Sequence, residues 1–348
     1  MANPNAVFVG CDLGDKQSEM CVVDQTGAVI ESKRVRTTKQ ALVRALRKYD
    51  RAQVVVEAGT HSRWVEEALT SAGHQVVVAN PRQIQLIWGR RKKTDRSDAM
   101  VLARLARVDL TLLAPVHQRS RGAQVDLASL RSRDILVSVR TKLVNHVRGL
   151  LKQFGVRVES CSTAAFASRA GEVVPAELRP ALVPVLEALG EVTEQIAVHD
   201  RQVEQLVKAS PIAMRLAQID GVGPITALAF RLTIEEPAKF KKSRVVAAFL
   251  GLVPAKDQSG ASDPQKHITK AGNLFLRRLL VQCAHRLLGA FGPDCDLRRW
   301  GLTLGGRGGP AGRKRAIVAV ARKLAVVMHR VWVTGRPYDP HFSALAAA

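Results

Sequence analysis

Two short apolar runs near the start of the chain each end on an acidic residue. Asp12 ends AVFVGCD and Glu57 ends QVVVE, and both runs have the β-branched composition of buried strands. Further along, Asp95 and Asp98 lie three positions apart in KKTDRSDA, at a predicted helix start. Residues three apart face the same side of a helix, so this pair can point at a common site. A fold that serves all four acids must bring two strand ends and one helix start together.

Up to residue 79 the pattern predicts an α/β domain. The expected order is three strands, a helix, a strand, a helix and a strand, over residues 6–11, 20–24, 28–35, 39–49, 53–57, 62–72 and 75–79. In open α/β sheets, ligands gather at the carboxyl ends of the strands. Acids that end the first and fourth strands, followed by a helical acid pair, give the layout of a ribonuclease H-like metal site, in which those two strands are neighbours.

The four acids therefore form a candidate metal site. Four oxygen ligands can hold one or two Mg²⁺ ions, with Mn²⁺ as a substitute, which is the machinery for breaking and joining phosphodiesters. A structural interpretation exists for each acid alone, because strand-end acids often cap turns and Asp95 can cap its helix. That interpretation does not account for all four acids at these places.

The charge balance favours a polyanionic partner. The chain has 348 residues with 53 Lys and Arg against 30 Asp and Glu, a net charge of +23. Five basic residues close to the acid pair are predicted to hold a phosphate backbone, although a solvated helix face is the alternative: Arg90, Arg91, Lys92, Lys93 and Arg96. No apolar run is long enough to span a bilayer and no signal-peptide core is evident, so we expect a cytoplasmic protein with no membrane partner. Five scattered cysteines without a CxxC pair are expected to be reduced thiols.

The middle of the chain predicts two long helices. Apolar residues recur at three- and four-residue steps over 124–154 and again over 181–208. The pair can form an antiparallel coiled coil or part of a bundle, and can serve as a dimerisation element or as an arm. We therefore divide the chain into an α/β domain over 1–118, a helical insert over 119–210 and a mainly α-helical C-terminal domain over 211–348.

The last third contains a glycine-containing turn and a basic loop. In IDGVGPITALAF, Gly221 and Gly223 have the spacing of a helix-hairpin-helix turn whose N–H groups reach phosphate, although a plain helix–helix turn remains open. A polar loop then leads into an amphipathic helix, with predicted nucleic-acid contacts at Lys266, Lys270, Arg277 and Arg278. The segment GLTLGGRGGPAGRKR is expected to be a flexible basic loop.

With these motifs placed, the chain resembles the IS110-type DEDD transposases, a group that includes the Piv-like invertases. GCDLGDKQ, VVVEAGT and NPRQIQ…KKTDRSDA resemble the family's three acidic motifs. In the second half, IDGVGPITAL, FLGLVP, QSG and HITKAGNLFLRRLL resemble its C-terminal transposase domain in the same order. The resemblance covers essentially the whole chain.

The resemblance implies that Asp12, Glu57, Asp95 and Asp98 are the metal-binding tetrad of a RuvC-like domain. It also implies a serine nucleophile, which the SG motif places at Ser259. Ser262 is the near alternative, because ASDPQ follows where the family has glycines and basic residues, and Ser243 is a third choice that looks more like a helix start.

The implied activity is a DNA transposase that forms a transient phosphoserine–DNA ester. The family further implies donor and target DNA, a structured guide (bridge) RNA, dimers that assemble into a tetrameric synapse, and a nucleoid-associated prokaryotic protein. The main alternative is a RuvC-like Holliday-junction nuclease that hydrolyses DNA without a serine. An actin-like or sugar-kinase-like ATPase lacks its second phosphate loop here, and a non-catalytic scaffold would not need an intact tetrad.

Overall fold

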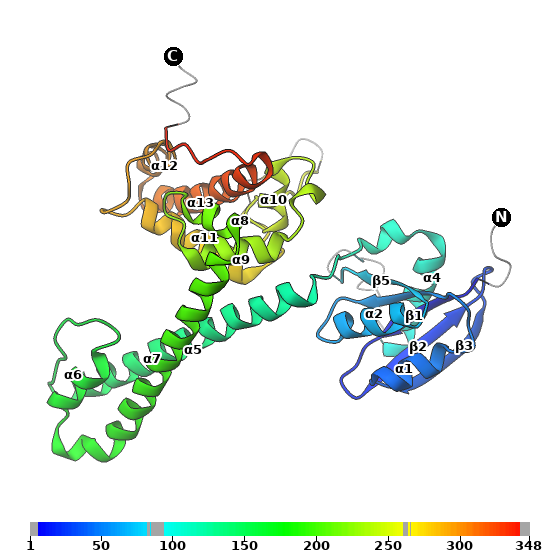
Figure 1. Ribbon diagram of the computed structural model, residues 1–348, viewed down its shortest axis with the longest axis horizontal. Coiled ribbons are helices and arrows are strands. Elements are labelled where there is room, and N and C mark those ends of the chain that lie inside the picture. The colour runs from blue at the N-terminus through cyan, green and yellow to red at the C-terminus, as the bar shows by residue number, and fades with distance from the viewer. Residues whose placement is uncertain (1–5, 82–83, 85–93, 260–263, 265, 342–348) are drawn as a thin grey trace. The chain divides into compact units, whose positions relative to one another are not determined.

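The computed structural model describes residues 6–81, 84, 94–259, 264 and 266–341 (Figure 1). Contacts divide the chain into two compact units, Met1–Gln118 and Arg119–Ala348. The first unit is a mixed α/β domain and the second is helical. The finer division into three domains stays a prediction.

A single sheet forms the centre of the described part of the first unit. Its strands are β1 (Phe8–Asp12), β2 (Gln17–Val23), β3 (Val29–Arg36), β4 (Gln53–Glu57) and β5 (Gln75–Ala79), in the spatial order β3-β2-β1-β4-β5. The prediction that the first and fourth strands are neighbours is confirmed, because β1 pairs with β4 in parallel. The β1–β2 and β2–β3 pairs are antiparallel, and β4–β5 is parallel.

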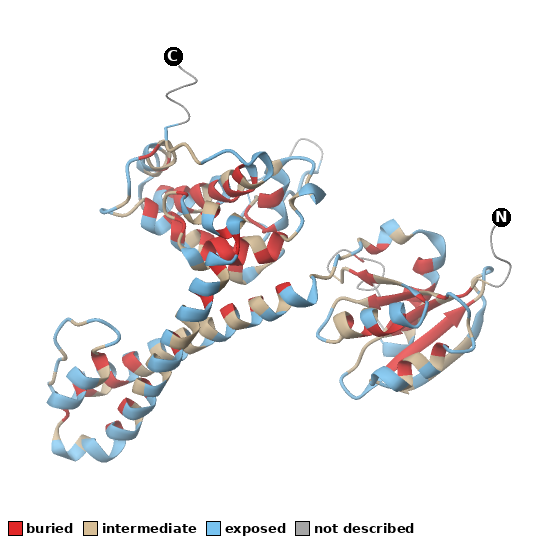
Figure 2. Cartoon of the chain, in the orientation of Figure 1, coloured by how far each residue is buried: buried red, intermediate tan, exposed pale blue. Residues whose placement is uncertain are grey.

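Helices cover both faces of this sheet, which explains why its inner strands are continuous apolar runs. On β4, Val54 and Val56 pack with α1 (Lys39–Leu46) and α2 (Ser62–Ser71). Val55 points to the opposite face and packs with α4 (Asp95–Val108). Figure 2 shows buried residues along the strands of this unit. The alternation of side chains fixes which residues face each layer.

Helix α4 lies unusually close to strand β1. A Cβ added at Gly10 would stand 2.0 Å from the carbonyl oxygen of Ala99 and 2.4 Å from the amide nitrogen of Ala103. Only glycine leaves room for the helix backbone at this place. The helix begins in a capping box in which the Thr94 side chain accepts from Ser97 N and the Ser97 side chain accepts from Thr94 N. These two features fix where the helix lies and where it begins.

The second unit consists mainly of helices. Their bounds are α5 (Arg121–Gln153), α6 (Phe166–Val173), α7 (Arg179–Lys208), α8 (Pro211–Ala217), α9 (Pro224–Ile234), α10 (Ser243–Phe249), α11 (Leu274–Leu287), α12 (Asp296–Gly306) and α13 (Gly309–Thr334). Short 3₁₀ turns occupy Leu110–Leu113 in the first unit and Ala176–Leu178 and Pro237–Lys239 in the second. No helix of the described residues is both long and apolar enough to cross a bilayer.

The two long helices α5 and α7 run antiparallel along each other. Near one end, Leu127 of α5 belongs to the same buried cluster as Val203 of α7. Near the other end, Leu151 packs in a second cluster with Leu182 and with Phe166 of α6. Figure 1 shows the two helices lying side by side toward α6, crossing, and separating toward the start of α5 and the end of α7.

The segment GLTLGGRGGPAGRKR is not a flexible loop, and that expectation was wrong. It forms the end of α12 and the start of α13, with only Arg307 and Gly308 between them. A Cβ added at Gly301 would lie 2.6 Å from Val320 and 2.7 Å from Leu288. Gly301 therefore serves close helix packing, which a composition argument confuses with flexibility.

Replacing Gly10 by Ala is expected to destabilise the first unit, because the added methyl group collides with the backbone of α4. Overpacking of this kind costs about 1–3 kcal/mol. Urea unfolding followed by circular dichroism, together with hydrogen exchange of the β1 and α4 amides, measures the effect. Gly59→Ala is the matched control, since nothing lies within 4 Å of the Cβ it would add. An equal loss in both variants would contradict the close β1–α4 contact as the cause.

Candidate active site

The structure brings the four acids of the first unit to one cavity. Asp12, Glu57, Asp95 and Asp98 all line an open cavity of about 440 Å³. The other lining residues are Leu13, Ala58, Gly59, Thr60 and His61. Parallel pairing sends the ends of β1 and β4 to the same edge of the sheet, and the first turn of α4 supplies the remaining two carboxylates.

The four carboxylates differ in exposure. Asp98 is buried, with 4% of its surface exposed, whereas Asp95 is exposed and Asp12 and Glu57 are intermediate. Ser97 Oγ lies 3.4 Å from Asp98 Oδ1. Both helical acids lie in the first turn of α4, where the helix dipole favours negative charge. Asp98 is therefore the acid that the fold holds most firmly.

A cysteine next to the cavity is not part of its chemistry. Cys11 precedes Asp12 and is fully buried in the core. Burial first, and the charge of Asp12 second, raise the pKa of the Cys11 thiol to about 12. The thiol stays neutral at physiological pH, and the side chain packs in the core beneath the cavity.

The donor chemistry of the cavity fits a hard divalent cation. Its four acidic side chains offer only oxygen atoms, which Mg²⁺ and Mn²⁺ prefer. Within the described residues, no group of three or more His, Cys, Asp or Glu side chains already forms an arrangement that could hold a metal. The acids share a cavity but are not pre-set around one point, so binding requires their side chains to turn toward an ion.

Sequence reasoning missed His61, which lines the same cavity. It stands directly before α2, and its Nδ1 accepts a hydrogen bond of 3.1 Å from the indole Nε1 of Trp64. Its Nε2 lies 3.5 Å from Asp15 Oδ1. One feature of the sequence could have identified it. His61 follows Glu57, the acid that ends a buried strand, by four residues, and loops after such strand ends commonly carry binding residues.

The predicted phosphate contacts near the acid pair are only partly within the described structure. Arg96 is exposed, and its Nε donates a 3.1 Å hydrogen bond to Ser32 Oγ on β3. It lines a second cavity of about 520 Å³ that shares Asp95 with the first. Four more predicted residues lie outside the described residues: Arg90, Arg91, Lys92 and Lys93.

The glycine-containing turn joins α8 to α9. Gly221 has a φ of +79°, and a Cβ there would meet the Cys283 carbonyl oxygen at 3.3 Å, so α11 closes one side of the turn. At Gly223, which precedes α9, no atom lies within 4 Å of such a Cβ.

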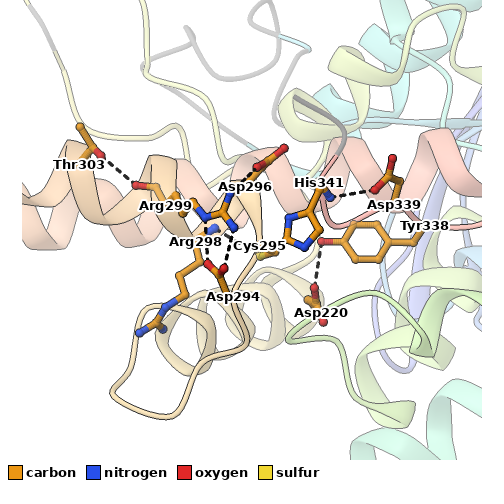
Figure 3. A network of polar contacts seen from close by, with 10 residues as sticks. All are labelled: Asp220, Asp294, Cys295, Asp296, Arg298, Arg299, Thr303, Tyr338, Asp339 and His341. Atoms are coloured by element: carbon orange, nitrogen blue, oxygen red, sulfur yellow. Dashed lines mark hydrogen bonds and ion pairs between the residues drawn. The ribbon is translucent and has the colours of Figure 1, made fainter. Parts of the chain in front are cut away.

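Tyr338 donates a 3.4 Å hydrogen bond to Asp220 Oδ2, and Figure 3 shows the two side chains pointing toward each other. Burial raises the pKa of Tyr338, so its hydroxyl keeps the proton that it donates.

Among the serines of the second unit, Ser259 is exposed. Ser262 lies outside the described residues. The third choice, Ser243, begins α10 and hydrogen-bonds through Oγ to the buried His329 Nδ1 at 3.0 Å. Because His329 Nε2 is 3.0 Å from the Pro237 carbonyl, the ring donates there and accepts from Ser243. His329 thus connects the start of α10 and the turn at Pro237–Lys239 to α13, and the bonded position of Ser243 fits its interpretation as a helix start.

One predicted nucleic-acid contact of the C-terminal region needs correction. Arg277 is 7% exposed, and its Nη1 donates to the carbonyls of Leu250 and Ala271, each at 2.9 Å. Its guanidinium holds the preceding loop onto α11, which does not fit contact with phosphate. The amphipathic pattern identified the helix but could not show that the loop folds over this side chain.

The other predicted basic contacts of this region remain at the surface. Lys266 forms an ion pair with Asp257, and Arg278 forms one with Asp134. Lys270 is exposed and has a φ of +53°, an uncommon conformation for a residue with a side chain. These three cations stay available as predicted phosphate contacts.

Comparison with known proteins gives one consistent result. A family model described as "Transposase", for DEDD proteins of the IS110 type, matches residues 9–156, and the model "Transposase IS116/IS110/IS902 family" matches 213–296. The chain is 30% identical to the transposase for insertion sequence element IS1111A of Coxiella burnetii, over 92% of this chain and 88% of that protein. It is 28% identical to the transposase for IS1328 of Yersinia enterocolitica, over 81% and 84%. It is 25% identical to a pilin gene-inverting protein of Moraxella bovis, over 82% and 81%.

Divalent cations are expected to raise the melting temperature of the protein through the acid cavity. A ligand at 100 times its dissociation constant stabilises by about 2.7 kcal/mol. Thermal unfolding with and without Mn²⁺ or Mg²⁺ measures the shift, which Asp98→Asn should abolish. Asp109→Asn, which changes an exposed acid beyond the end of α4, should keep it. The same cation-induced shift in Asp98→Asn and in the wild type would place the metal elsewhere.

Proposed function

The chain belongs to the IS116/IS110/IS902 family of transposases, enzymes that cut and rejoin DNA, and from this we propose that it does so with a metal-assisted serine nucleophile under the guidance of an RNA. The observation that carries the proposal is the meeting of four carboxylates from β1, β4 and α4 in one cavity. A mixed sheet of this order, with its acids at the shared edge, supports a RuvC-like catalytic domain.

In this proposal Asp12, Glu57, Asp95 and Asp98 hold one or two Mg²⁺ ions, with Mn²⁺ as a substitute. When bound, such ions polarise the phosphate and stabilise the leaving oxygen. The chain's own part is to hold the carboxylates at one place. Cavity-lining residues then orient the phosphodiester for an in-line displacement.

Ser259 is the proposed nucleophile. Its Oγ forms a bond to phosphorus while the bond from phosphorus to a deoxyribose oxygen breaks. The serine proton leaves to a base or solvent, and the released deoxyribose oxygen takes up a proton from solvent and becomes a hydroxyl. The reverse reaction, with a different DNA hydroxyl attacking, rejoins the strand and releases the serine. The exposed position of Ser259 and the exposed cations Lys266 and Lys270 support this role. The tetrad of one subunit and the serine of another are proposed to form the complete site.

The proposed partners are donor DNA, target DNA and a structured guide RNA. The net charge of +23 supports polyanionic partners, and the turn at Gly221 and Gly223 is a proposed helix-hairpin-helix-like contact. The antiparallel pair α5–α7 is proposed as a coiled-coil element that joins two subunits, with a tetramer in the synapse. The relatives named above are bacterial, which supports action at the nucleoid in a prokaryotic cytoplasm.

A covalent trapping assay tests the mechanism. Protein, Mg²⁺, the element's flanking RNA and labelled donor and target DNA are incubated and separated on a denaturing gel. The wild type should give a protein–DNA band that disappears with Ser259→Ala, because the nucleophile is lost, and with Asp98→Ala, because the metal site is damaged. Both variants should still bind nucleic acid, since surface cations supply most of the affinity.

Two further variants make the assay specific. Ser162→Ala removes an exposed serine of the same unit and should leave the band unchanged. Ser262→Ala tests the neighbouring serine. Strand cleavage that needs Asp98 but gives no covalent band would instead indicate a hydrolytic, Holliday-junction type of nuclease.

A further inference from the structure

Among the described residues, few of the side chains that line the acid cavity can donate a hydrogen bond. Four of its lining residues are carboxylates, and none of the described residues that line it is Lys or Arg. The donor side chains that the structure places there are Thr60 and His61. A phosphodiester carries two non-bridging oxygens, and an oxygen that is not bound by a cation needs a donor when it leaves water.

The hydrogen bond from Trp64 decides which nitrogen of His61 carries the proton. An indole N–H can only donate, so Nδ1, at 3.1 Å from it, must be the unprotonated nitrogen. The proton of the neutral ring is therefore on Nε2. The two rings also pack edge to face, with centroids 5.8 Å apart, which fixes the plane of the imidazole.

The loop that carries His61 is tied down by hydrogen bonds, two of them made by a buried serine. Ser62, which is 2% exposed, donates through Oγ to the Gly59 carbonyl at 2.8 Å. The same oxygen accepts from Gln118 Nε2 at 2.9 Å. Ala58 N donates to the Ala79 carbonyl at 2.9 Å, which joins the start of the loop to β5. His61 is thus presented by a rigid turn rather than by a free loop.

We propose that the Nε2–H of His61 donates a hydrogen bond to a non-bridging oxygen of the scissile phosphodiester. This inference rests on the proposed function and names a further catalytic residue for it. Nε2 is 3.5 Å from Asp15 Oδ1, at the outer limit of a hydrogen bond, and the Asp15 side chain is 90% exposed. The N–H can therefore leave Asp15 for a phosphate oxygen at little cost.

A neutral donor suits this cavity better than a cation does. Lys or Arg among four carboxylates would pair with them and compete with a metal ion for the same oxygens. The neutral imidazole adds no charge, so it leaves the carboxylates to the metal. As negative charge builds on the phosphoryl oxygens, the hydrogen bond strengthens and lowers the barrier.

The test combines His61 variants with sulfur-substituted DNA. Removing one such donor is expected to slow strand cleavage by about 100-fold in His61→Ala, with DNA binding and melting temperature unchanged. His61→Gln should restore part of the rate, because its amide N–H can reach the same oxygen. Trp64→Phe removes the group that fixes the tautomer and should give an intermediate loss.

Phosphorothioate substitution distinguishes a direct contact from a structural role. Sulfur is a poor hydrogen-bond acceptor, so placing it at the oxygen that His61 contacts should slow the wild type. For that one diastereomer, the sulfur effect should vanish in His61→Ala, since the hydrogen bond is already absent. His117→Ala, an exposed histidine of the same unit that does not line the cavity, should behave as the wild type.

The outcomes separate this inference from the proposed function. If the wild type does not cleave DNA, the proposed function fails. It also fails if the Asp98→Ala variant cleaves DNA as fast as the wild type does. If cleavage needs Asp98 but His61→Ala cuts at the wild-type rate, only the role of His61 fails. A slow His61→Ala variant that keeps both diastereomeric sulfur effects would also overturn it, because the histidine would then act without touching the phosphate.

Discussion

The parallel pairing of β1 with β4 is the contact on which the candidate site depends. It places Cys11 opposite Val56, so that Asp12 and Glu57 follow at neighbouring strand ends. A slip of one residue would turn every side chain of β4 to the opposite face. Val54, Val55 and Val56 are all fully buried, and such a slip would exchange the residues that pack against the two helical layers. The register that fills the core is therefore the register that assembles the acids.

A second constraint fixes the other two acids. The side chain of Asp98 can reach the cavity only if α4 lies close to β1 and begins at the correct residue. Gly10 permits the close approach, and the capping box of Thr94 and Ser97 sets the start. The first helical turn is also where a carboxylate costs least, because it faces unpaired N–H groups. The glycine in β1 and the capping box of α4 thus place Asp95 and Asp98 at the edge of the sheet.

Much of this arrangement could be predicted from the sequence, because strands buried on both faces and a capped acidic helix start leave strong local patterns. Asp12 and Glu57 were identifiable as the ends of such strands. His61 was not, since its importance depends on a cavity and on Trp64 rather than on its own spacing. The prediction for Arg277 was wrong for the same kind of reason. A helical pattern shows that a helix is amphipathic, but it does not show which loop covers a given side chain. Gly301 looked like part of a loop, because composition does not separate flexibility from close packing.

The chain combines a net charge of +23 with a cavity lined by four carboxylates, and these act on DNA in opposite directions. Surface Lys and Arg attract the phosphate backbone wherever it lies, whereas the carboxylates repel the one phosphate that must enter the cavity. Under the proposed function, a divalent cation removes that repulsion, so binding of DNA and breakage of DNA become separate events. Affinity then comes from residues outside the cavity, and cleavage depends on the cation inside it. A neutral donor such as His61 preserves this separation, because it assists the phosphate without weakening the hold of the acids on the metal.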